Sequence, residues 1–282
     1  MAAISLEYAA PDADLRDYVS VFYDFRADIP MFEDEERADL AQFRFLLSTG
    51  KGEYHFADGT SQATAAIQIL GPTTGVTRVR VEGPVDLFGA GLLPAGWAAL
   101  MGADASTMVN RMIDATAVFG RSLAGYADRL SAAATLCDRA MIGNEMVRAL
   151  VAGAAETPGG FTRMVDRWLA GAASPDIDCL VAESGLSRRQ VERLCKRFYG
   201  VPPKLLARKY RALRAAVALA RGEAELGDML DRGFYDQSHF IREVKQFTGI
   251  TPGKFAEDLP TLARLTLKRG AFEELSSLVT DT

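Results

Sequence analysis

The sequence is poor in the residues that bind metals and form disulfides, with two histidines, His55 and His239, and three cysteines. Metal centres usually gather two or three such ligands, so we expect no metal and no cofactor. Neither a glycine-rich phosphate loop nor a GxSxG nucleophile elbow occurs, which argues against an enzyme. Because Cys137, Cys179 and Cys195 are too scattered for a disulfide framework, we expect them to be buried thiols.

Long apolar runs are also missing from the sequence. No stretch approaches the ~18 uninterrupted apolar residues of a membrane span, and residues 1–11 lack the basic start and apolar core of a secretory signal. We therefore expect a cytoplasmic protein with no membrane partner. Since the chain has 282 residues, of which 49% are hydrophobic, we expect two domains, each with its own core.

The net charge of −5 hides two segments of opposite sign. Residues 1–160 carry 12 Lys and Arg against 21 Asp and Glu, a net of −9. Residues 161–215 carry 12 Lys and Arg against five Asp and Glu, a net of +7. A basic segment within an acidic chain is typical of a surface that binds nucleic-acid phosphates.

The first 93 residues read as short strands separated by turns. Glycines and Gly-Pro pairs interrupt segments rich in β-branched and aromatic residues, at 19–25, 42–47, 53–56, 64–70, 77–81 and 85–92. Such spacing favours a small barrel or sandwich. From Pro94 the pattern becomes helical, with further helices predicted over residues 122–136 and 140–154. Residues 157–160, Thr-Pro-Gly-Gly, are the best linker candidate.

A first helix-turn-helix unit follows this linker. Residues 177–184 read as a short helix, Gly185 as the turn, and residues 187–199 as a second helix, whose start fits a capping box of Ser187 and Gln190. The second helix combines an apolar stripe with a basic outer face, which is what the major groove of DNA accepts. For this unit alone, a solvated helix with an arginine-rich face is the alternative.

A second unit repeats the first in outline. Residues 226–232 read as its short helix, and Asp236 caps a second helix over residues 237–247. The caps Ser187 and Asp236 lie 49 residues apart, and both units end in an aromatic residue, then glycine, then proline. This repetition favours a DNA-binding module over a merely solvated helix.

The motifs of both units resemble those of the AraC/XylS family of transcription regulators. GFYDQSHFIRE at 233–243 with FTGITP at 247–252 resembles the family signature, and LSRRQVER at 186–193 with FYGVPPK at 198–204 resembles its first unit. The resemblance covers about a third of the chain. It implies a long connecting helix at about residues 204–221 and two recognition helices in successive major grooves. Departures at Cys195, Val244 and residues 228–230 stay apolar where the core requires it, so they affect packing more than fold.

The N-terminal half resembles, more loosely, the sensor-like region of one AraC subgroup, through residues 71–74 and 87–97. This resemblance implies a cupin-like β-barrel with a helical extension. The predicted fold class is therefore α+β, with an all-α double helix-turn-helix domain at the C-terminal end. The predicted divisions are a sensor or dimerisation domain at 1–157 (β-rich 1–93, helical 94–157), a DNA-binding domain at 161–258 and a C-terminal tail at 259–282.

These patterns predict a sequence-specific DNA-binding transcription regulator. Arg189 and Arg193 are expected to read bases, since arginine can donate two hydrogen bonds to guanine, with Arg188 and Gln190 on phosphate. The predicted DNA contacts are Arg188, Arg189, Gln190, Arg193, Lys196, Gln237, Ser238, His239, Arg242 and Lys245. The expected partners are double-stranded DNA and an unknown small-molecule effector, with RNA polymerase and a second copy of the chain as further candidates.

One alternative is an interaction module that kept the fold but lost specific DNA binding. The second unit favours it, because residues 223–254 hold four basic residues against six acidic ones. The other alternative is an enzyme built on the barrel. The scarcity of histidine argues against it, since His55 is the only histidine in that region and is expected to be a surface or hydrogen-bonded residue.

Overall fold

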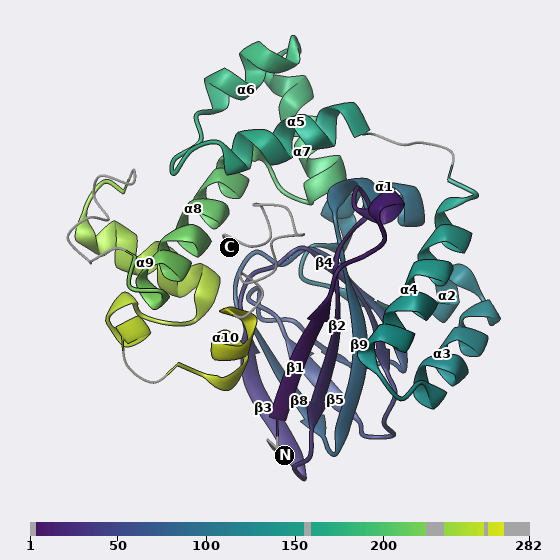
Figure 1. The fold of residues 1–282 in the computed structure, drawn as a ribbon. Helices are drawn as coiled ribbons and strands as arrows, with labels where there is room; N and C mark the ends of the chain where they lie inside the picture. The colour runs from purple at the N-terminus through teal and green to yellow at the C-terminus, as the bar shows by residue number, and fades with distance from the viewer. Residues whose placement is uncertain (1–3, 155–158, 224–233, 257–258, 268–282) are drawn as a thin grey trace.

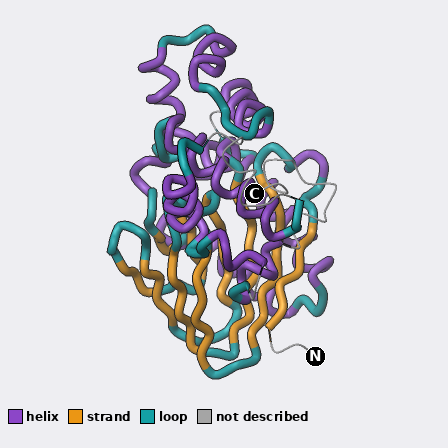
Figure 2. Tube along the Cα trace, turned by 90° about the vertical axis from the view of Figure 1, so that its left-hand side faces the viewer, coloured by secondary structure: helices purple, strands orange, loops and turns teal. Residues whose placement is uncertain are grey.

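A computed structural model of the chain describes residues 4–154, 159–223, 234–256 and 259–267. The N-terminal half consists of two antiparallel sheets, and the C-terminal half is helical (Figures 1 and 2). This confirms the predicted α+β class. In the described part of the chain, no helix has the length and apolarity needed to cross a membrane.

The two sheets differ in size and in strand order. One has six strands in the order β1-β2-β9-β4-β7-β10, and the other has four in the order β3-β8-β5-β6. The strands are hydrogen-bonded as two sheets, and not as one closed barrel. Their bounds are β1 (Ile4–Ala9), β2 (Val19–Ala27), β3 (Met31–Glu36), β4 (Ala41–Leu46), β5 (Gly52–His55), β6 (Ser61–Ala63), β7 (Ile67–Leu70), β8 (Thr77–Glu82), β9 (Val85–Leu92) and β10 (Met112–Asp114).

The larger sheet is covered on both faces. Phe22, Phe43 and Phe88 pack with Trp97 and Leu130 in a core shared with the helices that follow the sheet. The opposite face forms a second core with the smaller sheet. Because both faces are buried, β2 is buried without interruption over its first seven residues and shows no polar alternation.

Helices α1 to α4 follow β9 in the chain, and Figure 1 shows α2, α3 and α4 on one side of the larger sheet, where α4 packs against β1 and β2. Arg139 of α4 is almost fully buried, and its guanidinium pairs with the carboxylates of Asp24 and Asp86 on the sheet. Cys137 is exposed, as is Cys179 in the C-terminal half, so the expectation of buried thiols is wrong for both and holds only for Cys195. Both face solvent because they lie outside the buried stripes of their helices. The bounds are α1 (Pro94–Met101), α2 (Thr116–Phe119), α3 (Ser122–Ala132) and α4 (Leu136–Val151).

The helices of the C-terminal half form two apolar cores that share one long helix, α8. The first core joins α5, α6 and α7 to the first half of α8, and the second joins α9 to its second half. The predicted helix at residues 226–232 lies outside the described residues. Gly159 and Gly160, predicted as linker, are the first residues of α5. The bounds are α5 (Gly159–Ala170), α6 (Ile177–Ser184), α7 (Arg188–Tyr199), α8 (Pro203–Ala220), α9 (Gln237–Thr248) and α10 (Thr261–Thr266).

Candidate functional site

The start of α7 is fixed by local hydrogen bonds. Gly185 ends α6 in the left-handed conformation, at φ 65°, which glycine adopts without strain. The Ser187 backbone N–H donates to Gln190 Oε1 at 2.9 Å, and the Gln190 N–H donates back to the Ser187 hydroxyl, which completes the predicted capping box. The Gln190 side chain is therefore folded back onto the helix start.

Helix α7 has one buried and one basic face. Val191, Cys195 and Phe198 are buried in the first helical core. The predicted base-reading Arg189 and Arg193, together with Lys196, are exposed, and among the described residues none of the three forms an ion pair. Arg188, in contrast, pairs with Asp178 of α6. The structure thus leaves three cations on this helix without a carboxylate partner.

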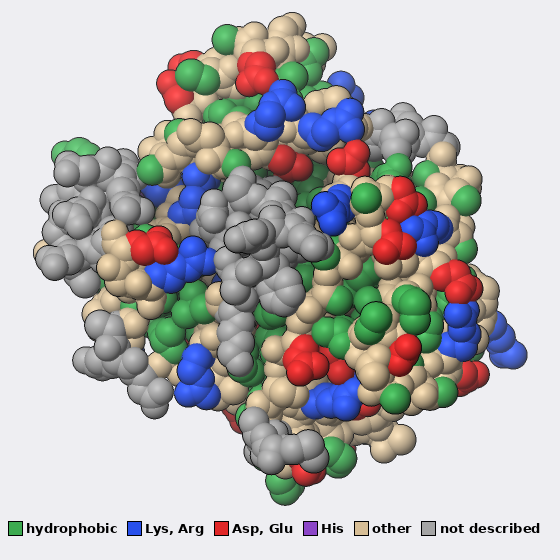
Figure 3. Space-filling view, in the orientation of Figure 1, with side chains coloured by type: hydrophobic (Ala, Val, Ile, Leu, Met, Phe, Trp, Pro, Cys, Tyr) green, Lys and Arg blue, Asp and Glu red, His purple; other side chains and the backbone are tan. Residues whose placement is uncertain are grey.

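Most other cations of the basic segment hold the protein together. Arg208 and Arg211 pair with Glu243, and Lys209 is buried. Arg214 donates to the backbone carbonyls of Leu169, in α5, and Ala172, just after it. Arg163 and Arg167 pair with Asp17 and Glu183 respectively. The net of +7 therefore overstates the positive charge available to a ligand. Figure 3 shows basic side chains over α5 and α7 next to acidic ones.

Helix α9 repeats this arrangement with fewer charges. The Asp236 carboxylate accepts a hydrogen bond from the His239 N–H at 2.7 Å and caps the helix, as predicted. Its predicted contacts Gln237, Ser238, Arg242 and Lys245 are exposed. His239 is turned partly inward, because its Nε2 lies 3.3 Å from a carboxylate oxygen of Glu243 and about two thirds of its side chain is covered.

Glu243 of α9 has a structural role that was not predicted from the sequence. Its buried carboxylate accepts hydrogen bonds from Arg208 Nε at 2.5 Å and from Arg211 Nη2 at 2.7 Å. Burial alone would raise the pKa of this carboxyl, but the two arginine hydrogen bonds outweigh burial and hold the pKa below its usual range. The cluster fixes α9 to α8. The sequence feature that could have revealed this role is an acidic residue within the apolar stripe of Phe240, Val244 and Phe247.

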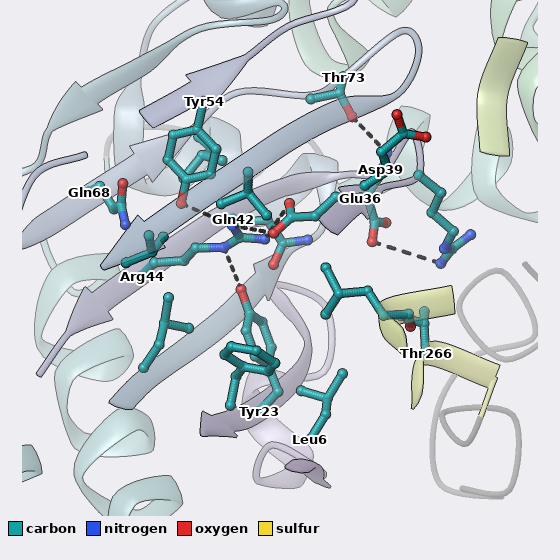
Figure 4. A pocket seen from close by; sticks show the side chains of 18 of the residues that line it. Leu6, Tyr23, Glu36, Asp39, Gln42, Arg44, Tyr54, Gln68, Thr73 and Thr266 are labelled. Atoms are coloured by element: carbon teal, nitrogen blue, oxygen red, sulfur yellow. Dashed lines mark hydrogen bonds and ion pairs between the residues drawn. The ribbon is translucent and has the colours of Figure 1, made fainter. Parts of the chain in front are cut away.

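A second candidate site is a cavity of about 120 Å³ between the two sheets. Arg44 of β4 lies in its wall, and its two Nη groups donate to the Glu36 carboxylate at 2.9 Å each (Figure 4). Arg44 Nε donates to the Tyr23 hydroxyl at 2.8 Å, and Nη1 also donates to the Tyr54 hydroxyl at 3.2 Å. Burial raises the pKa of both tyrosines, so each hydroxyl keeps its proton.

The cavity reaches the boundary between the two halves of the chain. Its lining includes Thr248, the last residue of α9, and Leu262, Ala263 and Thr266 of α10. Beside it, the Ala38 N–H donates to the Phe247 carbonyl at 2.7 Å, which ties an N-terminal loop to α9. A ligand in this cavity would therefore contact both the sheets and the helical half.

Glycine permits a second close contact between the two halves. Gly200 and Gly249 end α7 and α9 in the left-handed conformation, at φ 81° and 78°. A Cβ on Gly200 would lie 2.7 Å from side-chain atoms of Pro72 and Val109, and one on Gly249 would lie 2.7 Å from a carboxylate oxygen of Glu35. The C-terminal ends of α7 and α9 thus both lie directly against the N-terminal half.

Two separate stretches of the chain match known sequence families. A profile described as a helix-turn-helix domain matches residues 180–258, which include α7, α8 and α9. A second profile, described as a Domain of unknown function (DUF6597), matches residues 7–114, which include β2 to β10. The two matches fall on the two halves that the structure shows.

Individual proteins of known sequence or structure are also similar. The "F1 operon positive regulatory protein" of Yersinia pestis is 38% identical over 81 residues, 28% of this chain and 27% of that protein. This chain therefore spans about a quarter of that relative's length. The "Probable transcription factor PqrA" of Proteus vulgaris is 35% identical over 83 residues, 29% of this chain and 68% of that protein. The solved structure of ToxT from Vibrio cholerae O395 matches 80% of this chain and 96% of its own, at 11% identity and a TM-score of 0.42.

The repeated unit, its caps and the sequence matches agree. Two recognition-type helices, each capped at its start and closed by a left-handed glycine, pack on one shared helix within the matched helix-turn-helix domain. The "Probable transcription factor PqrA" matches over two thirds of its own length. The chain belongs to the AraC/XylS family of transcription regulators.

Proposed function

We propose that this protein regulates transcription by binding specific DNA sequences with the outer faces of α7 and α9. The observation that carries this proposal is the state of Arg189, Arg193 and Lys196, which are exposed opposite a buried stripe and, among the described residues, form no ion pair. Exposed cations without protein partners are available to phosphates and to guanine edges in the major groove. On α9, the exposed Arg242 lies as far from the helix cap as Arg193 does on α7.

A selection experiment tests this proposal on the full chain. Random duplexes are enriched by binding to the protein, and the enriched pool is sequenced and titrated at two salt concentrations. We expect a consensus with two half-sites about one helical turn apart, and an affinity that falls steeply with salt because bound phosphates release counterions. A pool that shows no consensus, or binding that salt does not weaken, would contradict the proposal.

We further propose that a small molecule in the cavity between the sheets controls this binding. Support comes from the lining, which includes residues of both sheets together with Thr248 of α9. A ligand that binds one arrangement of the two halves better than another shifts the protein toward that arrangement. The test is DNA titration of the parent and of a variant with the cavity filled, Val79→Trp. The proposal fails if the parent and Val79→Trp bind DNA with the same affinity, both with and without each small molecule tested.

This role also implies where the protein works and with what. A regulator that binds chromosomal DNA acts in the cytoplasm of a bacterial cell, and RNA polymerase and a second copy of the chain are its candidate partners.

One observation favours the alternative function, an interaction module without specific DNA binding. The exposed face of α9 carries Arg242 and Lys245 as its only cations among the described residues. Loss of consensus in the selection, with stable protein, would favour this alternative.

A further inference from the structure

Two buried glutamines in the cavity wall have hydrogen-bonding groups that nothing in the described structure satisfies. Gln68 of β7 is 1% exposed, and both its side-chain oxygen and its nitrogen lack hydrogen-bond partners among the described residues. Gln42 of β4, 7% exposed, has an unpartnered side-chain oxygen in that same set. The Tyr54 side chain lies near Gln68, but the two groups are not in hydrogen-bonding geometry.

A buried amide without hydrogen-bond partners destabilises the folded protein, so its presence calls for a partner. The strand direction explains why the glutamines face the cavity. Ile67 and Ile69 of β7 pack on the helix-covered face of the sheet, so Gln68 between them points to the other side. Arg44 lies directly opposite Gln68 in the β4–β7 pair, which places the arginine cluster and the amide side by side (Figure 4).

The charges around the cavity disfavour an anionic ligand. The charged lining residues are Glu35, Glu36 and Asp39 against Arg37 and Arg44, three carboxylates against two guanidinium groups. Arg44 donates both Nη groups to Glu36 and its Nε to a tyrosine. Arg37 lies 3.7 Å from the Asp39 carboxylate, and its buried Nε and Nη2 lack hydrogen-bond partners among the described residues. An incoming carboxylate at Arg37 would lie beside the Asp39 carboxylate, and the lining holds one more negative than positive charge, so a neutral ligand is favoured.

The rest of the wall is apolar and aromatic, with Phe25, Phe32, Leu70 and Val81 among the lining residues. The volume of about 120 Å³ is close to the ~150 Å³ of an engineered protein cavity that binds benzene. The occupant is therefore about the size of a substituted single ring. Its polar group has to reach Gln68 with both a donor and an acceptor, because the amide offers one of each.

We propose that the cavity binds a small, uncharged, ring-sized molecule that carries a carboxamide-like group and pairs that group with the Gln68 amide. Two primary amides can form a pair of opposed N–H···O=C hydrogen bonds, which satisfies both orphaned atoms of Gln68 at once. Gln42 then offers its free oxygen to the second N–H of the ligand amide. This inference rests on the proposed regulatory role of the cavity and specifies the ligand for it.

Binding of three matched probes to the full chain tests the chemistry. Benzamide, benzoate and benzylamine share one ring and differ in carrying a neutral amide, an anion or a cation. By calorimetric titration we expect benzamide to bind at least ~tenfold more tightly than either charged analogue. Naphthamide and naphthoate extend the test to a larger ring. Benzoate or benzylamine binding as tightly as benzamide, or no binding by either amide, overturns the proposal.

A pair of isosteric variants separates this role from a structural one. Gln68→Met removes an unsatisfied amide, so the melting temperature of the ligand-free protein should be unchanged or higher, while the response to benzamide is lost. Gln62→Met is the matched control. Its amide exchanges two hydrogen bonds with the Met112 backbone, at 3.1 and 2.7 Å, so this variant should melt lower and still respond to benzamide.

The probe titrations and the glutamine variants test ligand binding separately from DNA binding. The probe titrations contain no DNA, so their failure leaves the DNA-binding proposal standing. Conversely, tight benzamide binding by a protein that selects no DNA consensus would overturn the regulatory role alone. A Gln68→Met variant that binds benzamide as well as the parent would show that the amide does not recognise the ligand.

Discussion

Lys209 of α8 donates a hydrogen bond to the backbone carbonyl of Asp39 at 2.6 Å, across the boundary between the two halves of the chain. A second hydrogen bond from the same ammonium reaches the Thr73 carbonyl at 3.1 Å. Burial lowers the pKa of Lys209 to about 8, since the Asp39 carboxylate offsets desolvation only in part. A buried cation thus joins the helix shared by both recognition units to the loops beside the cavity.

From the lowered pKa of Lys209 we predict that the stability of the folded protein increases at alkaline pH. Its folded pKa lies below its ordinary value of 10.5, so between about pH 8 and 10.5 the unfolded chain binds more protons than the folded one. The free energy of unfolding should therefore rise over this range, by up to ~3 kcal/mol from this group. Urea unfolding of the parent and of Lys209→Met checks the prediction. Equal pH profiles for the two proteins would contradict it.

From the raised pKa of Asp166 in α5 we predict that stability decreases as the pH approaches neutral. Burial raises the pKa of its carboxyl to about 7. The single Tyr199 hydroxyl proton faces two acceptors, the Thr162 carbonyl at 2.8 Å and Asp166 Oδ1 at 2.7 Å, so a protonated Asp166 can donate to the tyrosine oxygen. Because the folded pKa exceeds the ordinary value of 3.8, the free energy of unfolding should fall as the pH rises from about 4 to 7.

The variant Asp166→Asn isolates this effect, since an amide N–H donates to the tyrosine oxygen at every pH. We expect urea unfolding to show a flatter profile than the parent between pH 5 and 8, and higher stability than the parent at pH 8. A variant that keeps the parent's slope would mean that Asp166 stays ionised throughout.

The cluster around Glu243 predicts a large loss of stability on mutation. Glu243→Ala leaves Arg208 and Arg211 beside a buried gap with no carboxylate, and breaking such a pair costs about 3 kcal/mol or more. Chemical denaturation of the full chain measures the loss. Glu192→Ala, on the exposed face of α7, is the control and should change stability by less than ~0.5 kcal/mol. Similar losses for the two variants would show that the cluster does not hold α9.

The free cations of α7 predict a loss of base discrimination. Arg193→Ala should lower the preference for the selected DNA by about 1–3 kcal/mol and relax specificity at one base position. Arg167→Ala, whose guanidinium is paired with Glu183, is the matched control and should leave discrimination unchanged. Anisotropy titrations against selected and substituted duplexes provide the measurement. A uniform loss over all duplexes would assign Arg193 to phosphate.

Features set by local sequence were predictable, and features set by long-range pairing were not. The ends of α6, α7 and α9 fell within one residue of prediction, because their caps interact with neighbouring backbone groups. These caps include Gly185, Ser187, Asp236 and Gly249. Strand β3 was missed, since MFEDEE has neither alternation nor β-branched residues and gains its strand form by pairing with β8.

The candidate site divides in the same way. The exposed face of α7 could be predicted from helical periodicity. The ion-pair partners of the cations on α8 could not, because Arg208 pairs with a carboxylate 35 residues away in the sequence. The same applies to the cavity. Arg44 and Gln68 are brought together only by the pairing of β4 with β7, which no local pattern specifies.

The most direct test of the account is a titration of the selected duplex with the parent, Arg193→Ala, Arg242→Ala and the double variant. If α7 and α9 both read the groove, each single variant weakens specific binding, and the double variant loses it almost completely, since separated contacts are roughly additive. Arg242→Ala should keep the salt slope within about one unit of the parent. If Arg242→Ala instead binds the duplex as tightly as the parent, α9 does not enter a groove and DNA is read by α7 alone.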